Sequence, residues 1–219
     1  EHITYLQSFQ YKKILKKRKY TFRKMNSLRT LDELGSPIRF YFPISELHSP
    51  TSYRYLKVLS DLEILFDGDS SLKNIAEIGG GFGGQMMLVA EKFTPSTITI
   101  YDLPEVLQLQ KKFLKEKIKD TQIIFADGRN PKAGSFDLVI SNYALSEISR
   151  NIQDEYFDEV LASSKCGYLT WNVLSEKELG GYSVDEVISK IPGSRIIEEK
   201  PLTAEGNVII VWGDNGGRI

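Results

Sequence analysis

Five glycines fall within the six positions 79–84, in the segment EIGGGFGG that begins at Glu77. The apolar run NIAEI precedes them and the helix-like run QMMLVAEKF follows. Glycine tolerates positive φ angles and lets a ligand approach the backbone, and a helix that begins at such a turn offers it N–H groups. We therefore predict a cofactor-binding turn at the carboxyl end of a strand. The expected contacts are Gly79, Gly80, Gly81 and Gly83.

Two known spacings fit this turn. Gly79, Gly81 and Gly84 match G-x-G-x-x-G, the fingerprint of dinucleotide binding. Glu77 with the glycines at 79, 81 and 83 matches E-x-G-x-G-x-G, which resembles motif I of class I S-adenosylmethionine-dependent methyltransferases. An acid at Glu77 can face the cationic ammonium of a methionine moiety but would repel a pyrophosphate. Glu77 thus favours the methyltransferase. An NAD(P)-dependent oxidoreductase and a non-catalytic cofactor-binding module remain as alternatives.

Acidic residues end the next two strand-like runs. Asp102 ends TITIYD, where a carboxylate can accept hydrogen bonds from both ribose hydroxyls of either cofactor, with Leu103 beside it. Asp127 ends IIFAD next to Gly128, and methyltransferases commonly place an acid here against the adenine amino group. Capping of the next helix and a simple Asp-Gly turn are alternative roles for the two acids. We expect all four residues to contact the cofactor.

The fourth strand-like run, FDLVIS, leads into SNYALSEI and brings three more polar side chains to the same sheet edge. Ser141 and Asn142 are predicted cofactor contacts, and Tyr143 is a predicted substrate contact. Methyltransferases that act on base amines or glutamine amides typically carry Asn/Asp-Pro-Pro-aromatic at this place. Because this chain has no such prolines, a hydroxyl acceptor is favoured.

Three segments together resemble one particular family of methyltransferases. EIGGGFGGQ, YDLPEVLQLQKKFL and SNYALSEI look like the sugar O-methyltransferases of bacterial cell-surface polysaccharide biosynthesis, over roughly residues 49–212. Phe82 stands where that family more often has Tyr, and residues 143–148 match its Asn-Ser-x-x-Glu-Met pattern only loosely. The resemblance implies S-adenosyl-L-methionine as cofactor and a sugar hydroxyl of a nucleotide sugar, lipid-linked glycan or polysaccharide end as acceptor.

Methyl transfer to a hydroxyl depends on alignment and gains from a general base. Glu147, which follows the fourth strand, is the preferred candidate base, although a solvated first-turn acid is the alternative. His48 is the second candidate, because histidine titrates near neutrality. Substrate contacts are also predicted at Tyr53, Arg54 and Asn172. No metal-ligand spacing is recognisable, so a metal-independent reaction is expected.

The predicted fold follows from alternating strand and helix patterns. The runs NIAEIG, TITIYD, IIFAD, FDLVIS and GYLTWNV suit buried parallel strands, and helical spacing separates them. SRIIEEKP and NVIIVWG are only five residues apart, which requires an antiparallel hairpin. We predict an α/β doubly wound domain over 49–219, with a Rossmann-like seven-stranded sheet that is parallel except for one strand. Ser49 and Pro50 should begin its first helix, which runs to about Phe66.

Residues 1–48 are predicted to form a basic helical arm and linker. Residues 1–60 carry 12 Lys and Arg against 4 Asp and Glu, whereas the rest of the chain carries 16 against 25. An amphipathic helix with solvated lysines is expected in the stretch from Tyr11 to Lys24. Peripheral contact with an anionic glycan or lipid surface is the alternative, and the acidic main domain argues against nucleic acid.

Composition sets the remaining expectations. A chain of 219 residues with 41% hydrophobic residues can bury one sizeable core. No apolar run approaches the ~20 residues that span a bilayer. The single cysteine, Cys166, excludes an intrachain disulfide and fits a reducing compartment. We therefore expect a soluble, cytoplasmic enzyme, and a homodimer remains open.

Overall fold

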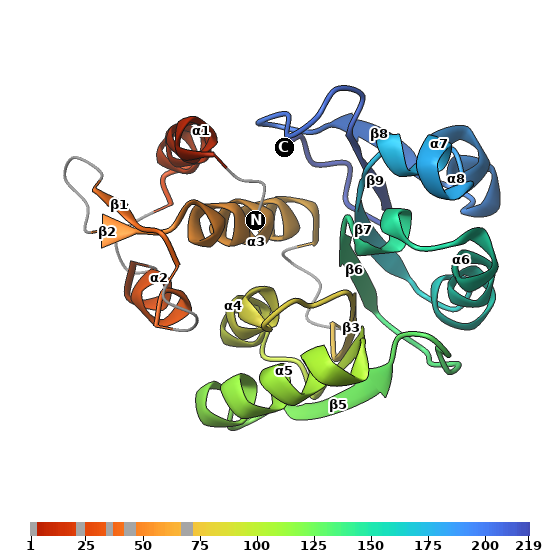
Figure 1. The fold of residues 1–219 in the computed structure, drawn as a ribbon, viewed down its shortest axis with the longest axis horizontal. Coiled ribbons are helices and arrows are strands. Elements are labelled where there is room, and N and C mark those ends of the chain that lie inside the picture. Colours follow the sequence, from red (N-terminus) through yellow and green to blue (C-terminus); the bar gives the residue numbers. More distant parts are fainter. Residues whose placement is uncertain (1–3, 21–24, 34–36, 42–46, 67–71) are drawn as a thin grey trace.

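A seven-stranded sheet forms the centre of the molecule (Figure 1), in a computed structural model that describes residues 4–20, 25–33, 37–41, 47–66 and 72–219. Its strand order is β5-β4-β3-β6-β7-β9-β8. The strands are β3 (Asn74–Ile78), β4 (Thr97–Asp102), β5 (Gln122–Asp127), β6 (Leu138–Asn142), β7 (Cys166–Trp171), β8 (Arg195–Glu198) and β9 (Val208–Trp212). The first five pair in parallel, and β9 runs antiparallel to both β7 and β8. The predicted sheet and hairpin are confirmed.

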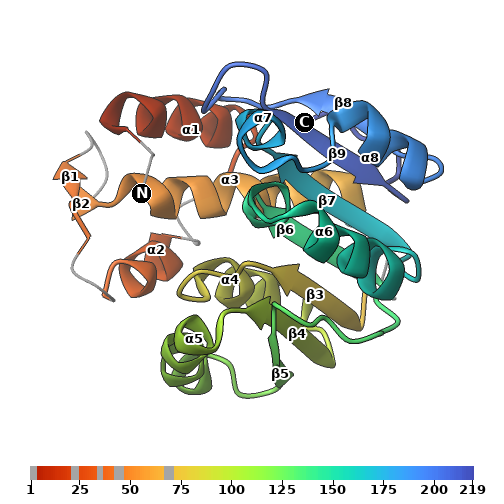
Figure 2. The same cartoon turned by 45° about the vertical axis from the view of Figure 1, so that its right-hand side comes forward.

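Helices cover both faces of the sheet, which explains why its central strands are mostly apolar. Side chains alternate along a strand, so Ile75 of β3 enters one core cluster while Ala76 and Ile78 enter the other. On one face lie α3 (Pro50–Phe66), α4 (Gly84–Phe93) and α5 (Pro104–Lys117) (Figure 2). On the other lie α6 (Arg150–Tyr156), the π-helical turn η3 (Phe157–Leu161) and α8 (Val184–Lys190). A short helix, α7 (Leu174–Leu179), follows β7.

The first helix of the predicted domain begins as expected. Pro50 opens α3, and the Ser49 hydroxyl accepts a hydrogen bond from the Ser52 backbone N–H. Six described elements were not predicted. They are α2 (Met25–Leu31), the strand pair β1 (Phe40–Tyr41) and β2 (Leu47–His48), the 3-10 helix η2 (Ala144–Glu147), α7 and α8.

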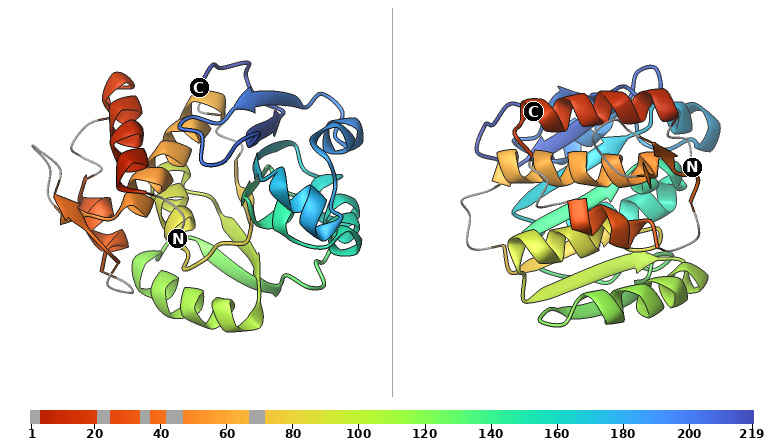
Figure 3. Two further views of the ribbon diagram at one scale, coloured as in Figure 1. Left: turned by 45° about the horizontal axis from the view of Figure 1, so that its top comes forward. Right: turned by 90° about the vertical axis from the view of Figure 1, so that its left-hand side faces the viewer.

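The predicted amphipathic helix is α1 (Tyr5–Lys17), which runs beside α3 (Figures 1 and 3). Tyr11 and Leu15 are buried, whereas Lys13 and Lys16 are exposed. The helix begins six residues before the predicted stretch and ends at Lys17, because Lys19 has a φ angle of 53° that breaks it. Residues 21–24 of the predicted stretch lie outside the described part of the chain. One face of α1 therefore belongs to the main core, and the other is basic.

A buried ion cluster joins α1 to the main domain. Arg18, just after α1, pairs with Asp61 of α3 at 2.6 Å, and Lys57 pairs with the other Asp61 oxygen at 2.6 Å. The Tyr168 hydroxyl of β7 donates to the same carboxylate at 2.7 Å. Because the Asp61 side chain is completely buried, these partners are needed to offset its desolvation.

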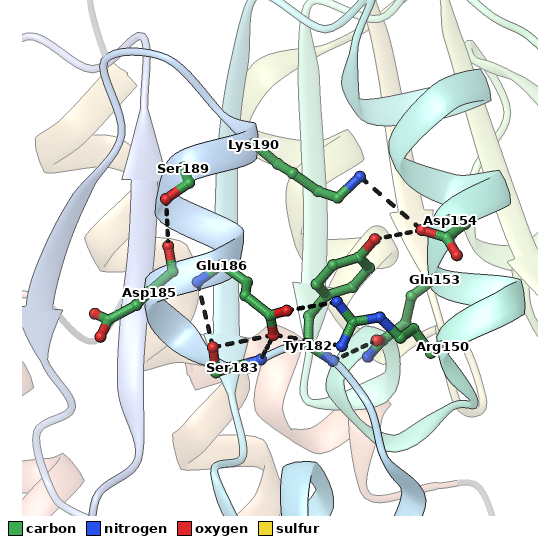
Figure 4. Close-up of polar contacts among 9 residues, drawn as sticks. All are labelled: Arg150, Gln153, Asp154, Tyr182, Ser183, Asp185, Glu186, Ser189 and Lys190. Atoms are coloured by element: carbon green, nitrogen blue, oxygen red, sulfur yellow. Dashed lines mark hydrogen bonds and ion pairs between the residues drawn. The ribbon is translucent and has the colours of Figure 1, made fainter.

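A second polar cluster fixes α8 against α6 (Figure 4). Arg150 lies over the Tyr182 ring, 4.0 Å from its centroid, and pairs with Glu186. The Tyr182 hydroxyl donates to Asp154. Buried Gln153 accepts from the Tyr182 N–H and donates to the Leu145 carbonyl of η2. This scaffold therefore supports η2, which follows β6.

The described residues contain neither a membrane-spanning helix nor a cluster of metal ligands. None of their helices is both long and apolar enough to span a membrane. Within the same ranges, no three His, Cys, Asp or Glu side chains come together as metal ligands.

Candidate active site

Four predicted polar side chains share one face of the sheet near its carboxyl edge. In the strand register Glu77 lies beside Ile100 and Ile140, so Asp102 and Asn142 stand one pleat further along the neighbouring strands. Asp127 is the partner of Asp102 on β5. Since residues two apart point to the same face, all four project toward the α3, α4 and α5 layer. The structure thus brings the predicted acids to one place.

The glycine turn, residues 79–84, opens directly above these acids. Gly79, Gly81 and Gly83 have φ angles of 75°, 54° and 96°, which explains why the turn needs glycine. A Cβ at Gly79 would lie 2.0 Å from the Ala144 Cβ of η2. At Gly81, by contrast, the nearest described atom would be the Tyr55 hydroxyl oxygen at 3.9 Å. The turn is therefore closed against η2 on one side and open on the other.

Glu77 is a buried acid with an unused oxygen. Its side chain is 2% exposed, and its Oε2 has no hydrogen-bond partner among the described residues. Burial, with the nearby charge of Asp102, raises the pKa of Glu77 to about 8, although Arg54 acts in the opposite direction. The carboxyl is thus mostly protonated at neutral pH. It can ionise when a cation binds beside it.

Asp102 is half-buried and already oriented. Its Oδ1 accepts from the Leu103 N–H at 2.8 Å, and its Oδ2 accepts from Gln110 Nε2 at 2.8 Å. Burial raises the pKa of Asp102, while hydrogen bonds from Leu103, Gln110, Gly81 and Gly80 lower it. The neighbouring Leu103 side chain is 50% exposed. A carboxylate with spare lone pairs next to an exposed apolar side chain suits a nucleoside.

The Asp127 carboxylate is bound by a residue that the sequence did not indicate. Arg129 Nε and the Asp127 oxygens lie 3.0 and 3.3 Å apart, and Arg129 NH2 is 2.6 Å from Oδ2. Hydrogen bonds from Arg129 lower the pKa of Asp127 to about 2. Gly128 lies against Asp102, since its Cβ would be 3.2 Å from the Asp102 backbone. Any ligand of Asp127 must share this carboxylate with Arg129.

The end of β6 combines a structural residue with a strained one. Ser141 is buried, donates to the Ile78 carbonyl and accepts from the Leu145 N–H, so it ties β3 to η2. Next to half-buried Asn142, Tyr143 has a φ angle of 71°, which costs a non-glycine residue about 1–3 kcal/mol. Such strain persists only where surrounding contacts enforce it.

Those contacts come from the β8–β9 loop and from α3. The Tyr143 hydroxyl donates to buried Glu199, and Glu199 also accepts from the backbone N–H of Thr203 at 3.0 Å. Burial and Glu199 raise the pKa of Tyr143 well above its usual value. The Arg54 guanidinium lies 5.6 Å from the Tyr143 ring centroid and 5.4 Å from that of Tyr55. Arg54 and Tyr143, both predicted substrate contacts, are thus neighbours.

The preferred candidate base is paired with another predicted residue. Glu147 is exposed at the end of η2, and its Oε1 accepts from Asn172 Nδ2 at 3.0 Å. The Asn172 N–H also donates to the Ser146 hydroxyl at 3.0 Å. η2 packs against Gly79 through Ala144. η2 therefore meets the glycine turn at Ala144, and it meets Asn172, which follows β7, at Glu147.

His48 and Tyr53 lie in the interior, only 1% and 3% exposed. His48 Nδ1 is 3.0 Å from Asp32 Oδ2, and Asp32 also accepts from the Ser49 N–H and the Ser52 hydroxyl. Burial would raise the pKa of Asp32, but these hydrogen bonds hold it below its usual value. His48 Nε2 has no partner within the described ranges. The proposed roles of His48 and Tyr53 stay predictions.

Comparison with known proteins relates this chain to O-methyltransferases. Residues 54–155 match the family model of an O-methyltransferase domain. A search of curated proteins found no match. The structure resembles mitomycin 7-O-methyltransferase MmcR, with 17% identity over 74% of this chain and 54% of that one, and a TM-score of 0.53. It also resembles an O-methyltransferase family 2 protein from Planctomyces limnophilus in complex with apigenin, with 15% identity over 87% and 62% and a TM-score of 0.53.

These likenesses show a methyltransferase fold, as predicted, and the chain spans less than two thirds of either protein's length. The domain match supports methyltransferase activity with S-adenosyl-L-methionine as cofactor. The geometry of the site, considered apart from the comparisons, also fits that cofactor. The buried Glu77 oxygen lacks a partner among the described residues, and the Gly81 side of the turn is open.

Proposed function

We propose that this protein is an S-adenosylmethionine-dependent O-methyltransferase that methylates a sugar hydroxyl in glycan or polysaccharide biosynthesis. One observation carries the cofactor assignment. Glu77 presents an unpartnered buried oxygen, among the described residues, below a turn that opens at Gly81. A cationic ammonium would satisfy that oxygen and favour the ionised carboxylate, whereas the charge of a pyrophosphate would oppose its ionisation. The NAD(P)-dependent alternative is therefore not favoured.

The remaining cofactor contacts are assigned by position. Asp102 would accept from the ribose hydroxyls, and exposed Leu103 would cover the adenine ring. Asp127 would accept from the adenine amino group if Arg129 shares its carboxylate. Gly128, Ser141 and Asn142 complete the edge, although Ser141 acts through its neighbours because it is 1% exposed.

When bound, the cofactor would supply an electrophilic methyl group on a sulfonium. The acceptor oxygen would bond to that methyl carbon in line with the breaking carbon–sulfur bond, and S-adenosylhomocysteine would leave. Glu147 takes the proton of the attacking hydroxyl, and Asn172 holds its carboxylate in place. Alignment of this kind contributes up to ~7–11 kcal/mol, and a general base adds ~10²–10⁴-fold. His48 is the second candidate base, because Asp32 binds Nδ1 and leaves Nε2 to accept a proton.

The acceptor assignment depends on the resemblance of the segments around the glycine turn, Asp102 and Tyr143 to sugar O-methyltransferases. Arg54 and Tyr143 would form the acceptor wall, with a cation that can bind hydroxyls or an acidic sugar. The Planctomyces limnophilus protein was solved with apigenin, so an acceptor of that kind is the competing possibility.

Calorimetry tests the cofactor. We expect S-adenosylhomocysteine to bind and NAD(H) not to bind, and Asp102→Ala to weaken binding by at least tenfold because the ribose loses its acceptor. Micromolar NAD binding without heat from S-adenosylhomocysteine would overturn the proposal.

Transfer of a labelled methyl group tests the acceptor. Nucleotide sugars and polysaccharide fragments should be methylated and apigenin should not. Methylation of apigenin alone would retain the enzyme class and reject the sugar.

A further inference from the structure

Gln110 is a buried amide on a helix face that is otherwise apolar. It is completely buried on α5, together with Leu107, Phe113 and Leu114. A buried amide costs free energy unless it is hydrogen-bonded, so its partners indicate why it is there. A leucine would fit the pattern of the helix equally well.

Both partners of Gln110 belong to the cofactor site. Its Nε2 donates to the Gly81 carbonyl at 2.8 Å and to Asp102 Oδ2 at 2.8 Å. Each partner can only accept, which fixes the orientation of the amide, with nitrogen toward the site. One side chain thus joins the open end of the glycine turn to the acid on the next strand.

The surroundings of Gly80 place Gln110 at the back of this site. A Cβ at Gly80 would lie 3.1 Å from Gln110 Nε2 and 2.7 Å from Glu77 Oε2. The amide therefore fills the space behind the turn, between Glu77 and Asp102. Its Oε1 is buried without a partner among the described residues. Packing alone does not account for an amide at this position.

We propose that Gln110 is a positioning residue of the cofactor site, which holds the Asp102 carboxylate and the Gly81 carbonyl in one fixed arrangement. This inference rests on the proposed cofactor. Gln110 itself would contact neither the acceptor nor the candidate base. Its effect should therefore appear in cofactor affinity and in the titration of Asp102, and not in acceptor specificity.

The test compares Gln110→Leu with Gln108→Leu, a change of the same type at an exposed position of the same helix. Gln110→Leu should weaken S-adenosylhomocysteine binding about tenfold or more, because a hydrogen bond to a charged group is lost. Gln108→Leu should bind like the wild type. Equal affinity of both variants would overturn the inference, whereas failure of the wild type to bind would instead overturn the proposed cofactor.

A second measurement needs no cofactor. Carboxyl carbon NMR should show the pKa of Asp102 higher in Gln110→Leu than in the wild type, since the amide hydrogen bond lowers it. Among the described residues, Glu77 and Asp127 lie on the same face of the sheet as Asp102, Tyr156 interacts with it from the other face, and the variant alters none of them. An unchanged pKa in a folded variant would contradict a positioning role.

Gln110→Glu provides the conservative variant. An ionised carboxylate cannot donate and would repel Asp102, so affinity should be lost at neutral pH and partly recovered as the pH falls and the new acid is protonated. Affinity that does not depend on pH in this variant would also count against the inference.

Discussion

The buried carboxyl of Glu77 should make the stability of the protein depend on pH. Its carboxyl lies under the glycine turn with an unpartnered oxygen, as far as the described residues show, and its pKa is raised to about 8 from the usual 4.5. The folded state therefore keeps a proton that the unfolded state has already lost between these two pH values. Stability should fall as the pH rises through that window.

We expect the free energy of unfolding of the wild type to decrease by up to about 1.4 kcal/mol per pH unit between pH 5 and 8 through this residue. Glu77→Gln removes the titration and should flatten the profile, whereas Glu116→Gln, at an exposed site, should not. Urea unfolding across this range measures the slopes. Parallel wild-type and Glu77→Gln profiles would contradict the assignment.

Individual site residues differed in how far the sequence could predict them. The positions of Glu77 and Asp102 were predictable, because Glu77 lies two residues before the first glycine and Asp102 ends the next strand-like run. Their contacts with a cofactor stay predictions. Gln110, Glu199 and Asp32 were not, because their partners Gly81, Tyr143 and His48 lie 29, 56 and 16 residues away. Only the folded chain brings such pairs together.

At the scale of elements, strongly periodic segments were the predictable ones. The buried strands and the helices α3, α4 and α5 follow long apolar patterns, so their existence and order could be inferred. The β1–β2 pair has two residues in each strand, and α2 and α8 have seven residues each. Elements of that length depend on tertiary contacts and leave little periodic signal.

The η2 element carries the candidate base, and its prediction concerns turnover. Glu147→Gln should leave S-adenosylhomocysteine affinity unchanged and slow methyl transfer at least tenfold, because the amide cannot take up the acceptor proton. Glu155→Gln, at an exposed position of the following helix, is the matched control. Full activity of Glu147→Gln together with loss of activity in His48→Ala would indicate that His48, and not Glu147, is the general base.

On the scale of the whole molecule, the basic arm is held to the main domain by buried contacts. Tyr11 and Leu15 enter the main core, and Arg18 reaches the buried Asp61. Charge composition indicated an amphipathic helix but gave no partner for it, since the ion pair joins residues 43 positions apart. The boundary predicted at residues 48 and 49 remains a prediction.

Arg18→Met should therefore destabilise the protein by about 1.5–3 kcal/mol, because a hydrogen bond to a buried carboxylate is lost while Lys57 and Tyr168 still bind that carboxylate. Lys13→Met changes an exposed lysine of the same helix and should stay within ~0.5 kcal/mol of the wild type. Urea unfolding compares the two. Equal stability would mean that the pair does not hold the arm in place.

The contact between Gly79 and Ala144 also has a consequence for substitution. With no room for a side chain between them, the turn that would receive the cofactor and the 3-10 helix η2 that carries Glu147 share a single wall. Any larger residue at position 79 must displace one of the two. A single mutation there would disturb the proposed cofactor contacts and the proposed base together.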